Sequence, residues 1–119
     1  MSKTIKIGIA SVPEMHARTQ AVVAGTRKVL PDEPKIWFPS IRDATRVVSD
    51  ENMAMLRVLR EQKPESVDAL AHAVGKPVTE VAQSLQTMAN FTLVKLTRKD
   101  GIVVPVAACD HVSIEYNVN

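Results

Sequence analysis

The three adjacent residues Cys109, Asp110 and His111 bring a thiol, a carboxyl and an imidazole together, and such groups can bind a metal ion or form a nucleophilic site. Adjacent residues of a strand point to opposite faces, however, and no nearby Cys/His pair completes a tetrahedral metal site. His16 and His72 each stand alone in a predicted helix. The sequence also has no glycine-rich phosphate loop and no nucleophile elbow. We therefore expect no metal, no cofactor and no catalytic activity, and we interpret Cys109 as a small buried apolar residue.

A different chemistry is available on residues 78–90, where apolar side chains recur at helical spacing and leave a polar face free. Amide side chains can read adenine through paired hydrogen bonds, and threonine can contact the thymine methyl group. Lysine and arginine beside such a helix contact phosphates and position a protein on DNA. The candidate DNA-binding residues are Lys76, Thr79, Gln83, Ser84, Thr87, Lys95, Arg98 and Lys99.

The charge of the chain gives only weak support to nucleic-acid binding. The formal net charge is +2, with +4 carried by residues 1–48 and −2 by residues 49–119. Residues 78–90 contain Glu80 and no lysine or arginine. Glu80 can accept a hydrogen bond from cytosine, but we interpret it as a charge that complements the helix N-terminus. The alternative function is a protein-interaction module whose helix-turn-helix no longer contacts DNA.

The elements around the polar face follow a recognisable order. A helix begins at Ser49-Asp50 and runs to about residue 62, and a short helix capped by Ser66 follows. Gly75 supplies a turn into a helix that starts near Pro77, and two strands, 91–98 and 102–106, are joined by Asp100-Gly101. This order predicts a winged helix-turn-helix.

The first 48 residues predict a strand, a helix, a second strand and a second helix. Residues 4–10 alternate as a half-buried strand does, and Ser11 with Glu14 forms a capping box. Residues 35–38 predict a short strand, and Ser40 begins another helix. We expect this region to form a homodimer, because its apolar residues need cover. The candidate dimerisation residues are Ile5, Ile7, Ile9, Val22, Val23, Trp37 and Phe38.

Trp37 and Phe38 allow two interpretations. An aromatic pair between two prolines suits a core or a dimer interface, and it also suits an anchor for a partner protein. The sequence alone leaves both open.

Composition sets the class of protein. The chain has 119 residues, of which 45% are hydrophobic and 24% charged, so it suits one compact unit or two very small ones. A single cysteine excludes an internal disulfide, and the first 25 residues lack the uninterrupted apolar h-region of a signal peptide. We expect a cytoplasmic α+β protein with no membrane partner. Its predicted domains are a dimerisation region at 1–48 and a winged helix-turn-helix with a C-terminal strand at 49–119.

Four segments resemble a known family: IKIGIASVPEMHART, PDEPKIWFPSI, ENMAMLRVLREQKPESVDALAHAVGKPVTEVAQSLQTM and LVKL followed by VVPV. They are similar to MarR-like winged-helix regulators, the TumA-like predicted transcriptional regulators that act as antitoxins to TumE-type toxins. The phrase DEPKIWF carries the most specific part of the likeness. The resemblance implies an autoregulating homodimer that binds a double-stranded DNA operator and neutralises a cognate toxin.

Overall fold

The computed structural model describes residues 3–118 and divides into two compact units. The sheet unit contains residues 4–46 and 112–118, and the winged-helix unit contains residues 3 and 47–111. Residues 1–2 and 119, which belong to the outer limits of the predicted domains, lie outside the described residues.

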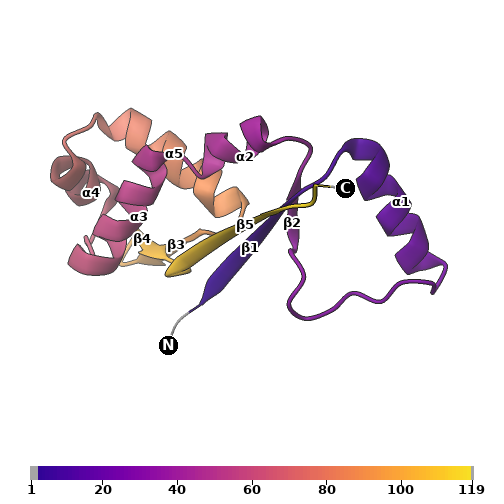
Figure 1. Cartoon of the computed structure of the whole chain (residues 1–119). Helices are drawn as coiled ribbons and strands as arrows, with labels where there is room; N and C mark the ends of the chain where they lie inside the picture. Colours follow the sequence, from indigo (N-terminus) through magenta and orange to yellow (C-terminus); the bar gives the residue numbers. More distant parts are fainter. Residues whose placement is uncertain (1–2, 119) are drawn as a thin grey trace. The chain divides into compact units, whose positions relative to one another are not determined.

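The sheet unit is built on three strands in the order β2-β1-β5 (Figure 1). The central strand β1 (Thr4–Ile9) pairs in parallel with β2 (Ile36–Phe38), and Gly8 lies opposite Trp37 in the register. Ile7 and Ile9 are buried and Ile5 is half-buried, but Lys6 is also half-buried and Gly8 is buried, so the predicted alternation of a buried and an exposed face is only partly observed. The two flanking strands give β1 backbone hydrogen-bond partners on both edges within one chain.

The last strand, β5 (His111–Tyr116), corrects the predicted domain division. We expected it to accompany the winged helix, but it pairs with β1. The two strands are joined at their start, where the backbone N–H groups of Asp110 and His111 donate to the carbonyl of Lys3 at 3.0 and 3.3 Å. The backbone N–H of Lys3 in turn donates to the Asp110 carboxylate at 2.7 Å. Strand β5 thus occupies the edge of β1 that β2 leaves open.

Between β1 and β2 runs α1 (Val12–Val23), whose start follows the predicted capping box. The Ser11 hydroxyl accepts from the backbone N–H of Glu14, and the Glu14 carboxylate accepts from that of Ser11, both at 3.3 Å. Gly25, at φ +78°, follows the helix end. No residue of α1 is buried, and Val23 is 84% exposed.

The helix α2 (Ile41–Val47) leads the chain toward the winged-helix unit. It begins as predicted at Ser40, whose hydroxyl accepts from the backbone N–H of Asp43 at 3.1 Å.

Three helices form the body of the winged-helix unit: α3 (Asp50–Gln62), α4 (Val67–Val74) and α5 (Val78–Asn90). The hydroxyls of Ser49 and Ser66 cap the first two, as predicted. Gly75 takes φ +69° at the turn between α4 and α5. The fully buried core residues come from all three helices and the segment after them: Met55, Leu70, Val81, Leu85, Met88 and Leu93.

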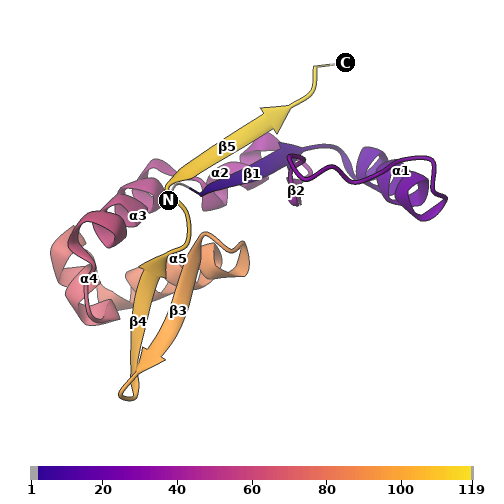
Figure 2. The same cartoon turned by 90° about the horizontal axis from the view of Figure 1, so that it is seen from below.

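The wing is the antiparallel hairpin of β3 (Val94–Lys99) and β4 (Ile102–Ala107). Asp100 and Gly101 have φ +54° and +78°, which is the two-residue turn that an Asp-Gly pair favours. Strand β3 begins three residues later than predicted, because Leu93 still donates its N–H to the carbonyl of Met88 at the end of α5. Figure 2 shows the hairpin extending away from the three helices, with its turn at the far end.

This arrangement is an α+β fold whose helix-turn-helix is followed directly by a wing, and it confirms the predicted winged helix-turn-helix. Within residues 3–118, no helix has both the length and the apolar character that a membrane span requires.

Candidate nucleic-acid interface

The polar face of α5 is held outward by the packing of the opposite face. Val81, Leu85 and Met88 are buried, while Thr79 and Gln83 are exposed one turn apart. Two other predicted residues, Ser84 and Thr87, lie at the margins of this face and are half-buried. The first half of α5 therefore offers Thr79 and Gln83 as its most accessible polar groups.

Two further amides extend this face and were not among the predicted site residues. Gln86 and Asn90 are exposed, and the Gln86 Nε2 group donates to Asn90 Oδ1 at 3.1 Å. The i, i+4 spacing of two amides was the signal in the sequence. With Gln83, they form what we call the amide face of α5.

Lys76, which we expected to contact phosphate, is already engaged. Its ammonium donates to the Glu51 carboxylate at 2.7 Å, which connects the start of α3 to the turn before α5. The hydrogen bond and charge of Lys76 hold the pKa of Glu51 below its usual range. Much of the positive field of Lys76 is therefore neutralised by Glu51.

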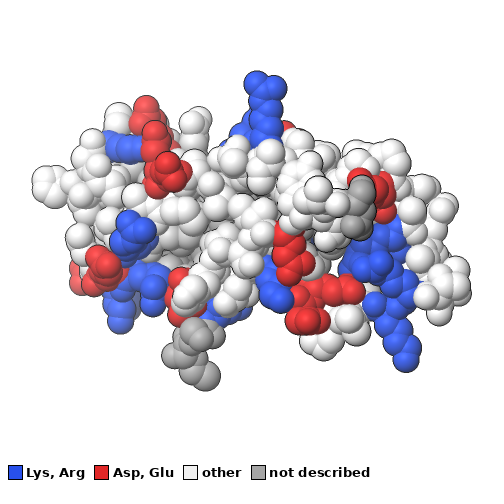
Figure 3. All heavy atoms as spheres, viewed as in Figure 1, with Lys and Arg blue, Asp and Glu red and all other residues white. Residues whose placement is uncertain are grey.

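The wing carries the free cations of this site. Lys95, Arg98 and Lys99 are all exposed on β3. Alternation along the strand places Lys95 and Lys99 on one face and Arg98 on the other. On the face of the molecule drawn in Figure 3, basic and acidic side chains are interspersed.

The predicted dimerisation residues contribute mostly to the sheet unit itself. Ile7, Ile9 and Phe38 are buried within a single chain, with exposed fractions of 0%, 4% and 6%. Ile5, Val22 and Trp37 are half-buried, and Val23 is exposed. Dimerisation through these residues stays a prediction. Val23 and the accessible parts of Val22 and Trp37 are the predicted residues that could contact a second copy of the chain.

Trp37 has two close neighbours. The Arg18 guanidinium lies 5.0 Å from the centre of its ring, and Arg18 also pairs with Glu33. A Cβ placed on Gly8 would overlap the ring, so the indole lies directly against the backbone of β1. This packing supports the core interpretation of Trp37.

The Cys109-Asp110-His111 segment is held in place by the burial of Cys109 and by hydrogen bonds of Asp110 and His111 to Lys3. Cys109 is buried, and that burial raises the pKa of its thiol. The hydrogen bond from the Lys3 backbone lowers the pKa of the Asp110 carboxyl, and His111 adds to this effect. Among residues 3–118, no three His, Cys, Asp or Glu side chains are grouped so that they could hold a metal ion.

The fold and the exposed surface define a winged helix-turn-helix protein with a polar helix face and a cationic wing. Residues 47–114 match the family model HVO_A0114, which covers more than half of the sequence, and the chain belongs to the HVO_A0114 family.

Among solved structures, the chain is similar to the homodimeric winged helix-turn-helix DNA-binding domain of a possible ArsR-family transcriptional regulator from Mycobacterium bovis. The two are 24% identical, with a TM-score of 0.48, and the match covers 57% of this chain. It covers 66% of that chain, just under two thirds of its length. No curated protein matches the sequence.

Proposed function

We propose that this protein is a DNA-binding transcriptional regulator that places α5 in the major groove of double-stranded DNA. The observation that supports this most is the exposed amide face of α5, which is the second helix of the helix-turn-helix and is followed directly by the cationic wing. A helix in the major groove reads bases through such amides, because Gln and Asn can form paired hydrogen bonds with adenine. Thr79 and Gln83 are the proposed base-reading residues nearest the start of the helix.

The wing supplies the phosphate contacts in this proposal. Lys95, Arg98 and Lys99 can each neutralise one phosphate, which gives a slope of log K against log salt of about −3 for one chain. Affinity that rests on so few cations is modest for a single winged helix. Two linked copies would add their contacts at high effective concentration.

We therefore also propose that the regulator acts as a homodimer, with the exposed part of α1 as the contact surface. Val12 and Val23 on α1 are 67% and 84% exposed, and Val29 and Leu30 in the following loop are 57% and 53% exposed. Val23 and Val29 line the same hollow beside α1, and exposed aliphatic residues grouped in this way are typical of an interaction surface. A second copy covering this surface would carry a second α5 to the other half of a two-fold symmetric operator.

The resemblance to MarR-like antitoxins supports a more specific version of this function. In it, the protein represses its own gene, works in the cytoplasm and neutralises a cognate toxin. If so, co-expression should relieve the growth arrest caused by the product of a small neighbouring gene, and the two proteins should purify as a complex. Absence of both relief and complex would contradict the toxin-binding role without affecting the proposal of DNA binding.

A second candidate function, a protein-interaction module without DNA contact, is favoured by the charge of the reading helix. Residues 78–90 carry no cation, and Lys76 is paired with Glu51. A helix of this kind gains little from phosphate attraction.

The two functions are separated by equilibrium binding of the full chain to two DNA duplexes, one from the gene's own upstream region and one with the same bases scrambled. We expect the upstream duplex to bind at least about tenfold more tightly, and both affinities to fall between about 50 and about 200 mM salt. Equal affinity for the two duplexes, or no binding at the lower salt concentration, would overturn the proposed sequence-specific regulator.

A further inference from the structure

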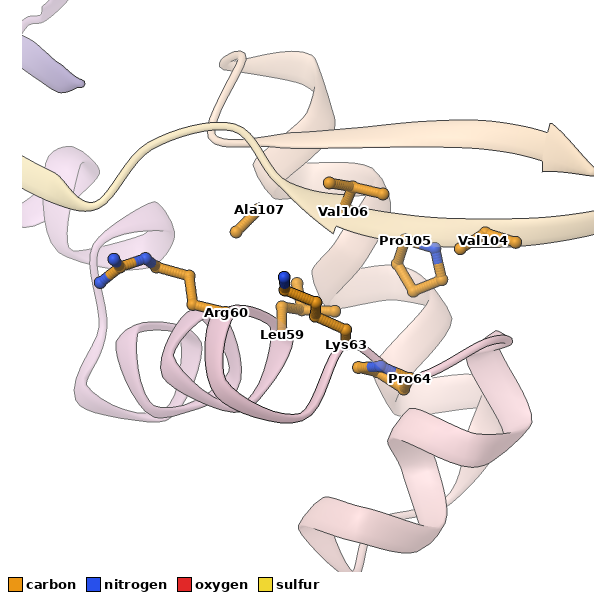
Figure 4. A pocket seen from close by; sticks show the side chains of 8 residues that line it. All are labelled: Leu59, Arg60, Lys63, Pro64, Val104, Pro105, Val106 and Ala107. Carbon is orange, nitrogen blue, oxygen red and sulfur yellow. The ribbon is translucent and has the colours of Figure 1, made fainter. Parts of the chain in front are cut away.

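A groove lies between the end of α3 and the wing strand β4, inside the winged-helix unit (Figure 4). Its volume is about 440 Å³, and we call it the α3–β4 groove. One wall is made by Leu59, Arg60, Lys63 and Pro64, and the other by residues 104–107. Its lining is largely aliphatic, with two cationic side chains on the α3 side.

The β4 wall of the groove is the open edge of a sheet. The wing has only two strands within residues 3–118, so β4 pairs with β3 on one side alone. In a two-residue hairpin the pair flanking the turn, here Lys99 and Ile102, exchanges hydrogen bonds, and every second pair after it does the same. Val104 and Val106 therefore bond to β3.

Pro105 and Ala107 consequently direct their backbone groups away from β3. Pro105 has no N–H, so the edge offers its carbonyl together with the N–H and carbonyl of Ala107. No backbone hydrogen bond joins the α3–α4 connection, residues 63–66, to this edge in the described structure. An extended segment of another protein could form backbone hydrogen bonds with these groups of Pro105 and Ala107.

The charge in the groove comes mainly from Lys63. This residue ends α3 in a left-handed conformation, with φ +47°, and its ammonium points toward β4 (Figure 4). No ion pair engages Lys63 within residues 3–118, whereas Arg60 points aside and lies 4.0 Å from the Asp110 carboxylate. A free ammonium above an aliphatic floor complements a carboxylate carried by an extended apolar segment.

We propose that the α3–β4 groove binds an extended acidic segment of a protein partner, which adds a strand to the edge of β4 and places a carboxylate beside Lys63. Such strand addition gains affinity from main-chain hydrogen bonds and specificity from the side chains that enter the groove. The proposal goes beyond the DNA-binding function and uses none of the residues assigned to DNA contact.

The test is a titration of the isotope-labelled full chain, followed by its backbone amide resonances, with the peptide acetyl-Val-Glu-Val-Glu-Val-amide. We expect saturable shifts centred on Ala107 and the end of α3. The peptide acetyl-Val-Lys-Val-Lys-Val-amide should bind at least about fivefold more weakly, as expected for one lost charge pair. The acidic peptide with every amide N-methylated should not bind, because it cannot donate to the edge.

Two variants complete the test. Lys63→Asn removes the ammonium and keeps a residue that tolerates the left-handed conformation, so it should weaken acidic-peptide binding about fivefold without lowering the melting temperature much. Lys99→Asn removes a cation from the wing tip and should leave peptide binding unchanged.

Three results would overturn the proposal. Equal binding of the N-methylated peptide would exclude strand addition. Shifts in the groove caused by benzoate and not by the acidic peptide would indicate a small-molecule site. Shifts caused in the same residues by duplex DNA, with no effect of the peptide, would assign the groove to nucleic acid.

Discussion

Lys76 shows how one contact can set the electrostatics of the reading helix. Its ammonium neutralises Glu51 at 2.7 Å and is therefore only partly available to a phosphate. Because the bond lowers the pKa of Glu51, the pair is intact above that pKa and is lost as the pH falls through it. At neutral pH the pair is intact.

We expect Glu51→Gln to free Lys76 for phosphate contact. Binding to upstream and to scrambled DNA should both tighten severalfold, and the salt slope should become steeper by about one. Glu61→Gln is the matched control, since it makes the same charge change on α3 and Glu61 has no ion pair within residues 3–118. Equal gains in the two variants, measured by fluorescence anisotropy, would mean that the Glu51 bond does not restrain Lys76.

A second prediction at the scale of single residues concerns Gly8. A methyl group there would overlap the Trp37 ring, so Gly8→Ala should destabilise the fold by about 1–3 kcal/mol in denaturant unfolding. In a Trp37→Leu background the same change should cost less, because the overlap is removed. An equal cost in both backgrounds would assign the effect to the strand backbone instead.

These residue contacts mark the limit of what the sequence predicts. The polar face of α5 follows from helical spacing alone, and so do its base-reading candidates. The pairing of Lys76 with Glu51 joins residues 25 positions apart, and the contact of Trp37 with Gly8 depends on the register of two strands. Neither leaves a local pattern in the sequence.

Elements were predictable where their signals act within a few residues. The serine caps and the Asp-Gly turn each place one hydrogen bond or one backbone conformation next to the residue that causes it. The sequence assigned β5 to the winged-helix region and gave it no partner, because strand pairing is decided by distant residues such as Lys3. For the same reason, the sequence did not show that β1 finds its partners, β2 and β5, within its own chain.

The wing turn gives a prediction at this scale. Gly101 has φ +78°, so Gly101→Ala should destabilise the protein by about 1–2 kcal/mol, the usual cost of a left-handed conformation for an L-residue. Gly101→Asn should cost less, because asparagine tolerates that region. Thermal unfolding of the two variants measures the difference, and equal losses would show that the turn conformation is not what glycine supplies.

At the scale of the whole molecule, the chain enters the winged-helix unit from the sheet unit and returns to it through β5. A cut between residues 48 and 49 would therefore separate β5 from β1. The two units are better tested by surface substitutions in the full chain than by truncation.

The proposed dimer is tested by a surface substitution in the full chain. Val23→Asp places a charge in the exposed aliphatic surface of α1 and should convert the dimer to a monomer in light scattering. Its affinity for a two-half-site operator should fall at least about tenfold. Val118→Asp is the control, because Val118 is 95% exposed in the same unit and is expected to leave the dimer intact. A dimer that persists in Val23→Asp would place the interface elsewhere.

The central claim, that α5 reads bases while the wing holds phosphates, is tested most directly by comparing Gln83→Ala with Lys99→Ala on upstream and scrambled duplexes. Gln83→Ala should lose affinity for the upstream duplex by about tenfold or more and leave scrambled binding unchanged, because it removes one base contact. Lys99→Ala should weaken both about equally and reduce the salt slope by about one. Equal loss on both duplexes in both variants would contradict the account, since Gln83 would then read nothing.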